Sequence, residues 1–123
     1  YDVQYAHARI CSILRLARER GLDIPPAREA NLELLTENAE LELIKQIANW
    51  PDTVAGAALA LEPHRLTHFA HDLASLFHSF YTSCRVLADD DELRKARLVL
   101  VEAARITLRN VLHLLGVSAP ERM

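Results

Sequence analysis

The sequence contains little glycine, with only 3 glycines among 123 residues, although half of its residues are apolar. A loop that cradles phosphate through glycine-rich backbone needs several glycines close together, so the chain does not encode such a loop. Disordered chains are poor in apolar residues, which this chain is not. The composition therefore predicts a single compact helical domain over residues 1–123, rather than a β-sandwich or a disordered tail.

Cysteine is also scarce. The two cysteines, Cys11 and Cys84, stand far apart and lack the Cys-x-x-Cys spacing that is typical of zinc sites. Both fall on or beside the apolar faces of expected helices. We therefore expect neither a disulfide framework nor a zinc site, but two buried thiols in a protein of the reducing cytoplasm.

Long apolar runs are absent as well. Charged residues recur along the whole chain, so no stretch reaches the roughly 18 apolar residues that a membrane-spanning helix needs. The first residues, YDVQYAHAR, lack the basic head and apolar run of a secretory leader. Because the chain opens directly into an expected helix, we expect it to be part of a longer protein.

The charges are unevenly placed along the chain. The net charge of −3 at first disfavours a nucleic-acid partner. However, residues 29–62 carry seven acids against one base, whereas residues 1–28 carry five bases against three acids and residues 63–123 carry eight against seven. Because the distribution of charge matters more than its sum, we expect the acidic middle to face away from a polyanion and the two ends to face one.

Apolar residues recur at steps of three and four, which is typical of helices that bury one face. The pattern predicts helices over residues 2–20 and 36–49, a short helix from Pro51, a long helix over 63–87, and a last helix from the acidic cap at 89–92 to 115. Thr36 is the expected N-cap of the second helix. With no convincing strand, the sequence predicts an all-α bundle of about five helices.

Two of these helices have expected core faces in detail. The long helix has the strongest periodicity, through Leu66, Phe69, Ala70, Leu73, Leu76, Phe77, Phe80, Cys84 and Leu87. The expected inward residues of the last helix are Leu93, Ala96, Leu100, Ala103, Thr107, Val111 and Leu114.

A histidine stripe lies opposite the apolar face of the long helix and comprises His64, His68, His71 and His78. Two histidines four residues apart can ligate zinc. However, ligands must converge from several segments, which a linear stripe does not do, and no HExxH motif is present. We expect a polar helix face that packs or hydrogen-bonds, and no metal site, although the role of the stripe stays open.

The sequence also predicts no catalytic residue. A nucleophile needs a base and an orienting group within reach. Serines on the surface of the long helix lie near histidines in sequence, but such serines usually lack an oxyanion hole.

Two tyrosines each have an arginine four residues later: Tyr5 with Arg9, and Tyr81 with Arg85. Such a pair offers an aromatic plane for a splayed RNA base and a cation for phosphate. The alternative is that each tyrosine simply packs at a seam between helices. The last helix adds a loose basic flank, which is either solvated or faces RNA, made of Arg94, Arg97, Arg105 and Arg109.

Three blocks of the chain resemble the arginyl-tRNA synthetase family. They are VQYAHARICSIL (3–14), EPHRLTHFAHDLASLFHSFYTSCRVL (62–87) and RITLRNVLHLLGVSAPERM (105–123), and the last resembles the family's C-terminus. Together they look like the all-helical, DALR-type anticodon-binding domain of these class I enzymes. The resemblance implies that Tyr5, Tyr81 and Met123 shape a pocket for the anticodon loop. With the two neighbouring arginines, the predicted tRNA-binding residues are Tyr5, Arg9, Tyr81, Arg85 and Met123.

The resemblance also implies a parent enzyme that joins arginine to its tRNA in the cytoplasm, most simply as a monomer. Its ATP and magnesium would be held by a separate catalytic domain of the same chain, so this part would need no cofactor. The partners implied are arginine tRNA and that catalytic domain. The alternatives are the related helical domains of cysteinyl- or glycyl-tRNA synthetase, and a helical module that binds protein rather than RNA. The ending LLGVSAPERM and the VQYAHAR block favour the arginine enzyme.

Overall fold

The computed structural model describes residues 2–123, and this part of the chain contains five α-helices and no strand. The helices are α1 (Asp2–Glu19), α2 (Asn38–Ala48), α3 (Trp50–Ala60), α4 (His64–Ser83) and α5 (Asp91–Leu114). Two short 3-10 turns, η1 (Ala27–Glu29) and η2 (Leu32–Leu34), lie in the linker between α1 and α2. The prediction of an all-α bundle of about five helices is confirmed. None of the described helices combines the length and the apolar character needed to cross a membrane.

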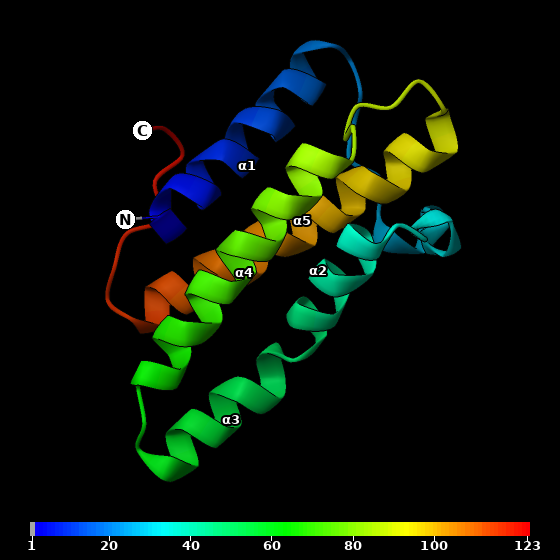
Figure 1. Ribbon diagram of the computed structural model, residues 1–123. Helices are drawn as coiled ribbons and strands as arrows, with labels where there is room; N and C mark the ends of the chain where they lie inside the picture. The colour runs from blue at the N-terminus through cyan, green and yellow to red at the C-terminus, as the bar shows by residue number, and fades with distance from the viewer. Residues whose placement is uncertain (1) are drawn as a thin grey trace.

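The bundle is built around α4, which packs against all four of the other helices (Figure 1). On one side α1 lies against both α4 and α5, and on the other side α2 and α3 cover α4. The N-terminal end of α1 and the C-terminal tail lie on the same side of the molecule. The seam between α1 and α4, closed at one side by the tail, is where the candidate site lies.

The apolar face of α4 forms the centre of the core. Phe69, Leu73, Phe77 and Phe80 are buried as predicted, whereas Leu66 is only half-buried. The prediction that this helix extends to residue 87 is wrong, because Cys84 adopts an extended backbone (φ −126°, ψ 136°). The chain has to reverse between α4 and α5, and the extended backbone places two further side chains in the core, those of Cys84 and Val86.

The helix α2 begins one residue later than predicted. Its N-cap is Glu37 rather than Thr36, and the Glu37 backbone N–H donates to Oε1 of Glu40 at 3.0 Å. A carboxylate at this third position satisfies an N–H that the helix leaves without a partner. Glu40 therefore turns back towards the bundle and is fully buried, instead of standing in solvent near the helix end.

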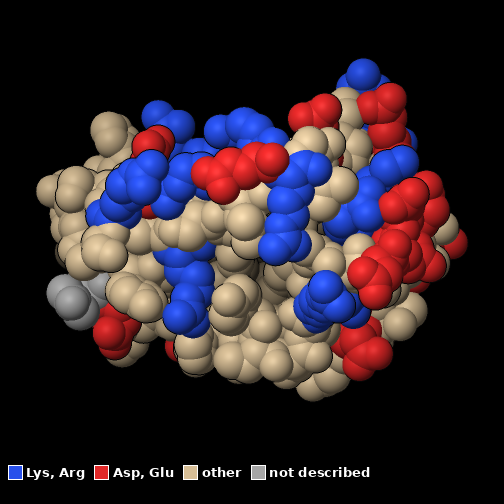
Figure 2. Space-filling model, turned by 90° about the horizontal axis from the view of Figure 1, so that it is seen from above, with Lys and Arg blue, Asp and Glu red and all other residues tan. Residues whose placement is uncertain are grey.

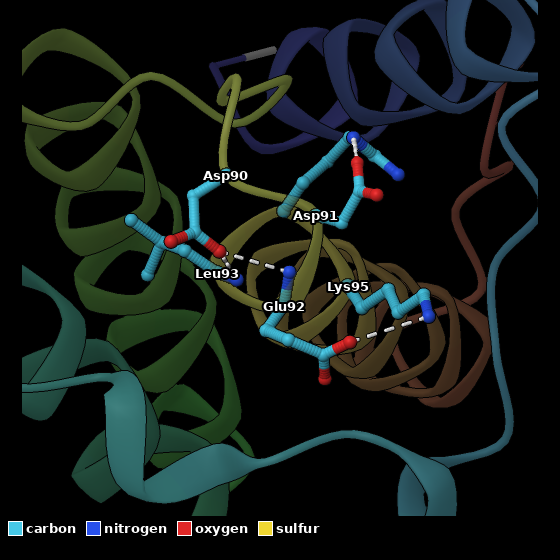
Figure 3. A network of polar contacts seen from close by, with 6 residues as sticks. Asp90, Asp91, Glu92, Leu93 and Lys95 are labelled. Carbon is cyan, nitrogen blue, oxygen red and sulfur yellow. Dashed lines mark hydrogen bonds and ion pairs between the residues drawn. The ribbon is translucent and has the colours of Figure 1, made fainter.

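The acidic segment before α5 is the predicted helix cap. Oδ1 of Asp90 accepts hydrogen bonds from the backbone N–H groups of Glu92 and Leu93, at 2.9 and 3.1 Å (Figure 3). Asp91 and Glu92 lie in the first turn, where negative charge interacts favourably with the positive end of the helix dipole. The same two carboxylates form ion pairs with Arg94 and Lys95 one turn on. This local chemistry fixes where α5 starts after the reversal.

The core face of α5 differs in part from the prediction. The predicted residues lie along one edge of the arc that α5 buries. Val111 in the last turn is fully buried, whereas Leu114, the last predicted residue, is 53% exposed. Contacts with α1, α2 and α4 instead bury a wider arc of the helix. It includes five apolar residues outside the predicted stripe: Leu98, Val101, Ala104, Leu108 and Leu112.

Candidate nucleic-acid interface

Four of the five predicted site residues line one hollow, which we call the tyrosine pocket. Tyr5 and Arg9 come from α1, Tyr81 comes from the end of α4, and Met123 comes from the C-terminal tail. The pocket has a volume of about 250 Å³, and its remaining lining residues are Ala8, Ser12, Ile13 and Leu16. The fold thus brings together residues from both ends of the chain and from the long fourth helix.

Arg9 lies between the two tyrosine rings of this pocket. Its guanidinium carbon is 4.8 Å from the ring centroid of Tyr81 and 5.4 Å from that of Tyr5. Its Nη1 also donates to Nδ1 of His78 at 3.3 Å. Cation–π contacts at such exposed positions are worth about 0.5–1 kcal/mol each. Together these contacts hold the arginine and both rings in a fixed arrangement across the seam between α1 and α4.

Both tyrosines keep accessible ring surface. Tyr5 is 45% exposed and Tyr81 is 40% exposed. The Tyr81 ring also lies nearly parallel to the buried ring of Phe77, with the centroids 6.3 Å apart. A ring that is supported on its inner side and open on its outer side is suited to stacking against a planar group from outside.

The predicted pairing of Tyr81 with Arg85 is wrong in its geometry. It assumed one helical turn between them, but α4 ends at Ser83, so Arg85 leaves the helix. The arginine that contacts Tyr81 is Arg9. Arg85 instead lines an adjoining hollow of about 310 Å³ that shares Tyr81, Ile13 and Leu16 with the tyrosine pocket. Its exposed side chain makes a long contact of 3.9 Å with Asp89.

A second hollow also adjoins the tyrosine pocket. It has a volume of about 380 Å³, shares Tyr5 and Arg9 with the tyrosine pocket, and includes His71 and His78 of the histidine stripe. His64 lies elsewhere, with its Nε2 3.5 Å from Glu62. Within residues 2–123, no three His, Cys, Asp or Glu side chains gather as a metal site would require. Two of the four stripe histidines, His71 and His78, thus line the hollow beside the tyrosine pocket, and His78 hydrogen-bonds Arg9.

Four arginines surround a further hollow on the other side of α1. This basic hollow has a volume of about 440 Å³ and also contains Cys11, Leu14, Glu102 and Glu121; its arginines are Arg15, Arg18, Arg105 and Arg122. Figure 2 shows the molecule of Figure 1 from above, and α1 lies at the top of Figure 1. Lys and Arg side chains spread along this upper face. The acidic side chains gather mainly at one end of it. Of the lining arginines, Arg105 is paired with Glu102, whose hydrogen bond raises the pKa of the Arg105 guanidinium.

The predicted basic flank of α5 does not exist as one surface. Arg97 is buried, and its Nε donates to Oε2 of Glu40 at 2.7 Å. Arg94 is largely covered and pairs with Asp91. Only Arg105 joins the basic hollow, while Arg109 lines a separate hollow near the end of α5. Arg15 and Arg18, three residues apart on α1, were the sequence signal for the basic hollow. Nothing in the sequence pattern indicated that Arg122 would join them.

The cysteines are free thiols. Cys84 is buried as predicted, whereas Cys11 is only half-buried beside the basic hollow. Desolvation raises the pKa of both thiols. A raised pKa lowers the thiolate fraction, and the thiolate is the reactive form. The geometry therefore favours packing roles for both side chains.

The chain matches known proteins over nearly its whole length. The family described as "DALR anticodon binding domain" matches residues 3–123. The chain is 87% identical to part of the arginine–tRNA ligase of Moorella thermoacetica and 62% identical to part of that of Heliobacterium modesticaldum, over its whole length in both cases. It spans 22% and 23% of those two proteins.

Solved structures give the same result. The arginyl-tRNA synthetase of Thermus thermophilus superposes with a TM-score of 0.84 at 33% identity, over 98% of this chain and 20% of that chain. The corresponding enzyme of Plasmodium falciparum superposes with a TM-score of 0.78 at 28% identity, over 98% of this chain and 21% of that one. These relatives confirm the resemblance and do not favour the cysteinyl, glycyl or protein-binding alternatives. The chain belongs to the DALR anticodon-binding domain family.

Proposed function

We propose that the tyrosine pocket receives the anticodon loop of an arginine tRNA, within a larger arginine–tRNA ligase. The observation that carries this proposal is the convergence of Tyr5, Arg9, Tyr81 and Met123 on one open hollow. Single-stranded RNA is read by stacking its unpaired bases on aromatic and guanidinium planes. The pocket offers both kinds of plane, and the relatives from Moorella and Thermus are ligases of this specificity.

Each side chain has a distinct task in this proposal. An unstacked base lies against the open face of Tyr81 or Tyr5, while Arg9 holds the two rings at a fixed separation. Met123 supplies an apolar wall that adapts its shape to the base. Arg85, exposed in the adjoining hollow, is free to meet a backbone phosphate, because its contact with Asp89 is long and solvated.

The basic hollow provides a path for the adjacent RNA backbone. Arg18 and Arg122 are exposed there, beside the tail that also carries Met123. Phosphate contacts position an RNA without reading its sequence, whereas contacts with the bases specify it. We therefore assign the tyrosine pocket to base recognition and the basic hollow to phosphates of the same tRNA.

The remaining steps of the proposed activity belong to the rest of the ligase. That part would bind ATP and magnesium and join arginine to the acceptor end, while the anticodon-binding domain holds the anticodon loop. This chain contains no glycine-rich loop that could bind the phosphates of ATP, so the proposal assigns ATP binding to the rest of the ligase. We further propose that the complete ligase is a monomer and acts in the cytoplasm.

The test is a comparison of Tyr81→Ala and Tyr81→Phe in the full ligase that contains this domain. Removing the ring removes one stacking plane, so Tyr81→Ala should weaken binding of arginine tRNA by about 1–3 kcal/mol. Tyr81→Phe keeps the ring and should bind almost like the parent. Affinity is measured by filter binding with intact tRNA at fixed salt. Parental affinity in a folded Tyr81→Ala enzyme would show that the pocket does not receive the anticodon loop.

A further inference from the structure

The C-terminal tail is fastened to the first half of α1. After α5 the chain turns at Gly116, where a positive φ of 73° reverses its direction. The Gln4 side chain then donates from Nε2 to the backbone oxygen of Ser118 at 3.0 Å and lies 3.2 Å from Ser118 Oγ. One turn further along α1, Nδ1 of His7 lies 2.8 Å from the backbone oxygen of Pro120. These contacts join residues at opposite ends of the chain.

His7 is a polar side chain in a buried position, with only 2% of its surface exposed. A backbone carbonyl only accepts hydrogen bonds, so Nδ1 must carry the proton that it donates to Pro120. The other ring nitrogen, Nε2, is buried and has no hydrogen-bond partner within the described residues. A buried polar atom without a partner destabilises the fold. The buried histidine thus supplies a directional hydrogen bond to the tail that an apolar side chain of similar size lacks.

The fastened tail contributes to both hollows of the candidate interface. Glu121 and Arg122 line the basic hollow, whereas the next residue, Met123, lines the tyrosine pocket. The tail therefore runs between the two hollows and completes each of them. A loose tail would remove one arginine from the proposed phosphate path and one wall from the proposed base pocket at the same time.

We infer that Gln4 and His7 are positioning residues for tRNA, which act by holding residues 118–123 across α1. Neither side chain lines the tyrosine pocket or the basic hollow. They work through the tail, which presents Arg122 to the RNA backbone and Met123 to the base. This inference rests on the proposed function, but the fastening of the tail is tested without RNA.

The first experiment measures the tail directly in the full ligase, by hydrogen exchange with mass spectrometry. His7→Phe keeps a ring but removes the donor, and His7→Asn restores a donor near the position of Nδ1. We expect His7→Phe to speed exchange at least tenfold at the Val117 N–H, which donates to the backbone oxygen of Leu112 at 2.9 Å, with α5 still protected, and His7→Asn to recover most of the protection. The control is His68→Phe on the exposed face of α4, which should leave the tail unchanged.

The second experiment separates positioning from a general structural role by measuring the KM for arginine tRNA. His7→Phe should raise this KM about three- to tenfold, the range expected when one hydrogen bond is lost. In a ligase that already carries Arg122→Ala and Met123→Ala, the same change should alter the KM by less than about twofold, because the tail then has little left to present. Gln4→Glu, which keeps the shape but removes the donor, serves in place of His7→Phe if the latter does not fold.

Two results would overturn the inference. One is unchanged exchange at the Val117 N–H in both His7→Phe and Gln4→Glu. The other is an equal rise of KM with and without the tail side chains, which would mean that His7 acts through the bundle. The proposed function fails separately, if Tyr81→Ala leaves tRNA binding intact while the exchange experiment still shows a fastened tail.

Discussion

The Arg97 guanidinium and the Glu40 carboxylate form a buried ion pair, with Nε and Oε2 2.7 Å apart. The same arginine donates from Nη1 to the backbone oxygen of Arg85 at 2.8 Å, and the other oxygen of Glu40 accepts from the N–H of Glu37. One ion pair therefore joins the start of α2, the first half of α5 and the connection that carries Arg85. The backbone of Arg85, a predicted tRNA-binding residue, is therefore held in place from inside the bundle.

Breaking this pair should be strongly destabilising. Arg97→Met leaves the Glu40 carboxylate buried without its partner, which typically costs about 3–5 kcal/mol. The double variant Arg97→Met with Glu40→Leu removes both charges and should recover most of that loss, since a packed apolar pair is often as stable as an ion pair. Urea unfolding of the three variants measures the difference. Additive losses in the double variant would contradict this account.

Phe77→Ala should lower the free energy of unfolding by about 3–5 kcal/mol, because the side chain is 1% exposed and its removal leaves a cavity. The matched control is Leu59→Ala on α3, where the side chain is 88% exposed. That change should stay within about 0.5 kcal/mol. Chemical denaturation followed by circular dichroism gives both values, and a loss below about 1 kcal/mol for Phe77→Ala would mean that the core is assigned to the wrong face of α4.

Arg85→Ala should make tRNA binding less sensitive to salt. Each phosphate contact that is lost lowers the slope of log affinity against log salt by about one. The control is Arg28→Ala in η1, which lines neither the tyrosine pocket nor the basic hollow and should leave the slope unchanged. A salt series with the full ligase measures both slopes. Identical slopes for the parent and Arg85→Ala would remove this residue from the phosphate path.

Cys84 should react slowly with alkylating reagents in the folded protein. Burial raises the pKa of its thiol above the ordinary value of 9.0, so less thiolate is present at any pH up to that range. As the pH rises above 9, the unfolded state loses the proton of the Cys84 thiol while the folded state keeps it. The contribution of this thiol to folding stability is therefore fully present below pH 9 and is lost as the pH rises above 9. Iodoacetamide labelling with peptide mass spectrometry tests the first point. Labelling of native Cys84 as fast as in denaturant would contradict it.

Local chemistry in the sequence was sufficient to predict the helices. Asp90 provides the cap of α5 and Gly21 ends α1 with a positive φ of 72°, and both effects act within one helical turn. The apolar periodicity of α4 identified its buried phenylalanines for the same reason. The end of α4 at Ser83 was missed because the chain reverses there to place Cys84 and Val86 in the core. The cap of α2 at Glu37 was missed although its cause is local, namely the capping box that Glu37 forms with Glu40.

Only part of the candidate site could likewise be predicted from the sequence. The sequence by itself determined that Tyr5 and Arg9 share one face of a helix, because four residues make about one turn. Only the tertiary structure decided that the arginine beside Tyr81 is Arg9 and that Met123 closes the pocket. It also decided that Arg97 points inward to Glu40. Periodicity specifies which face of a helix is buried, but the partner on that face depends on how helices distant in sequence pack together, and no local pattern encodes that.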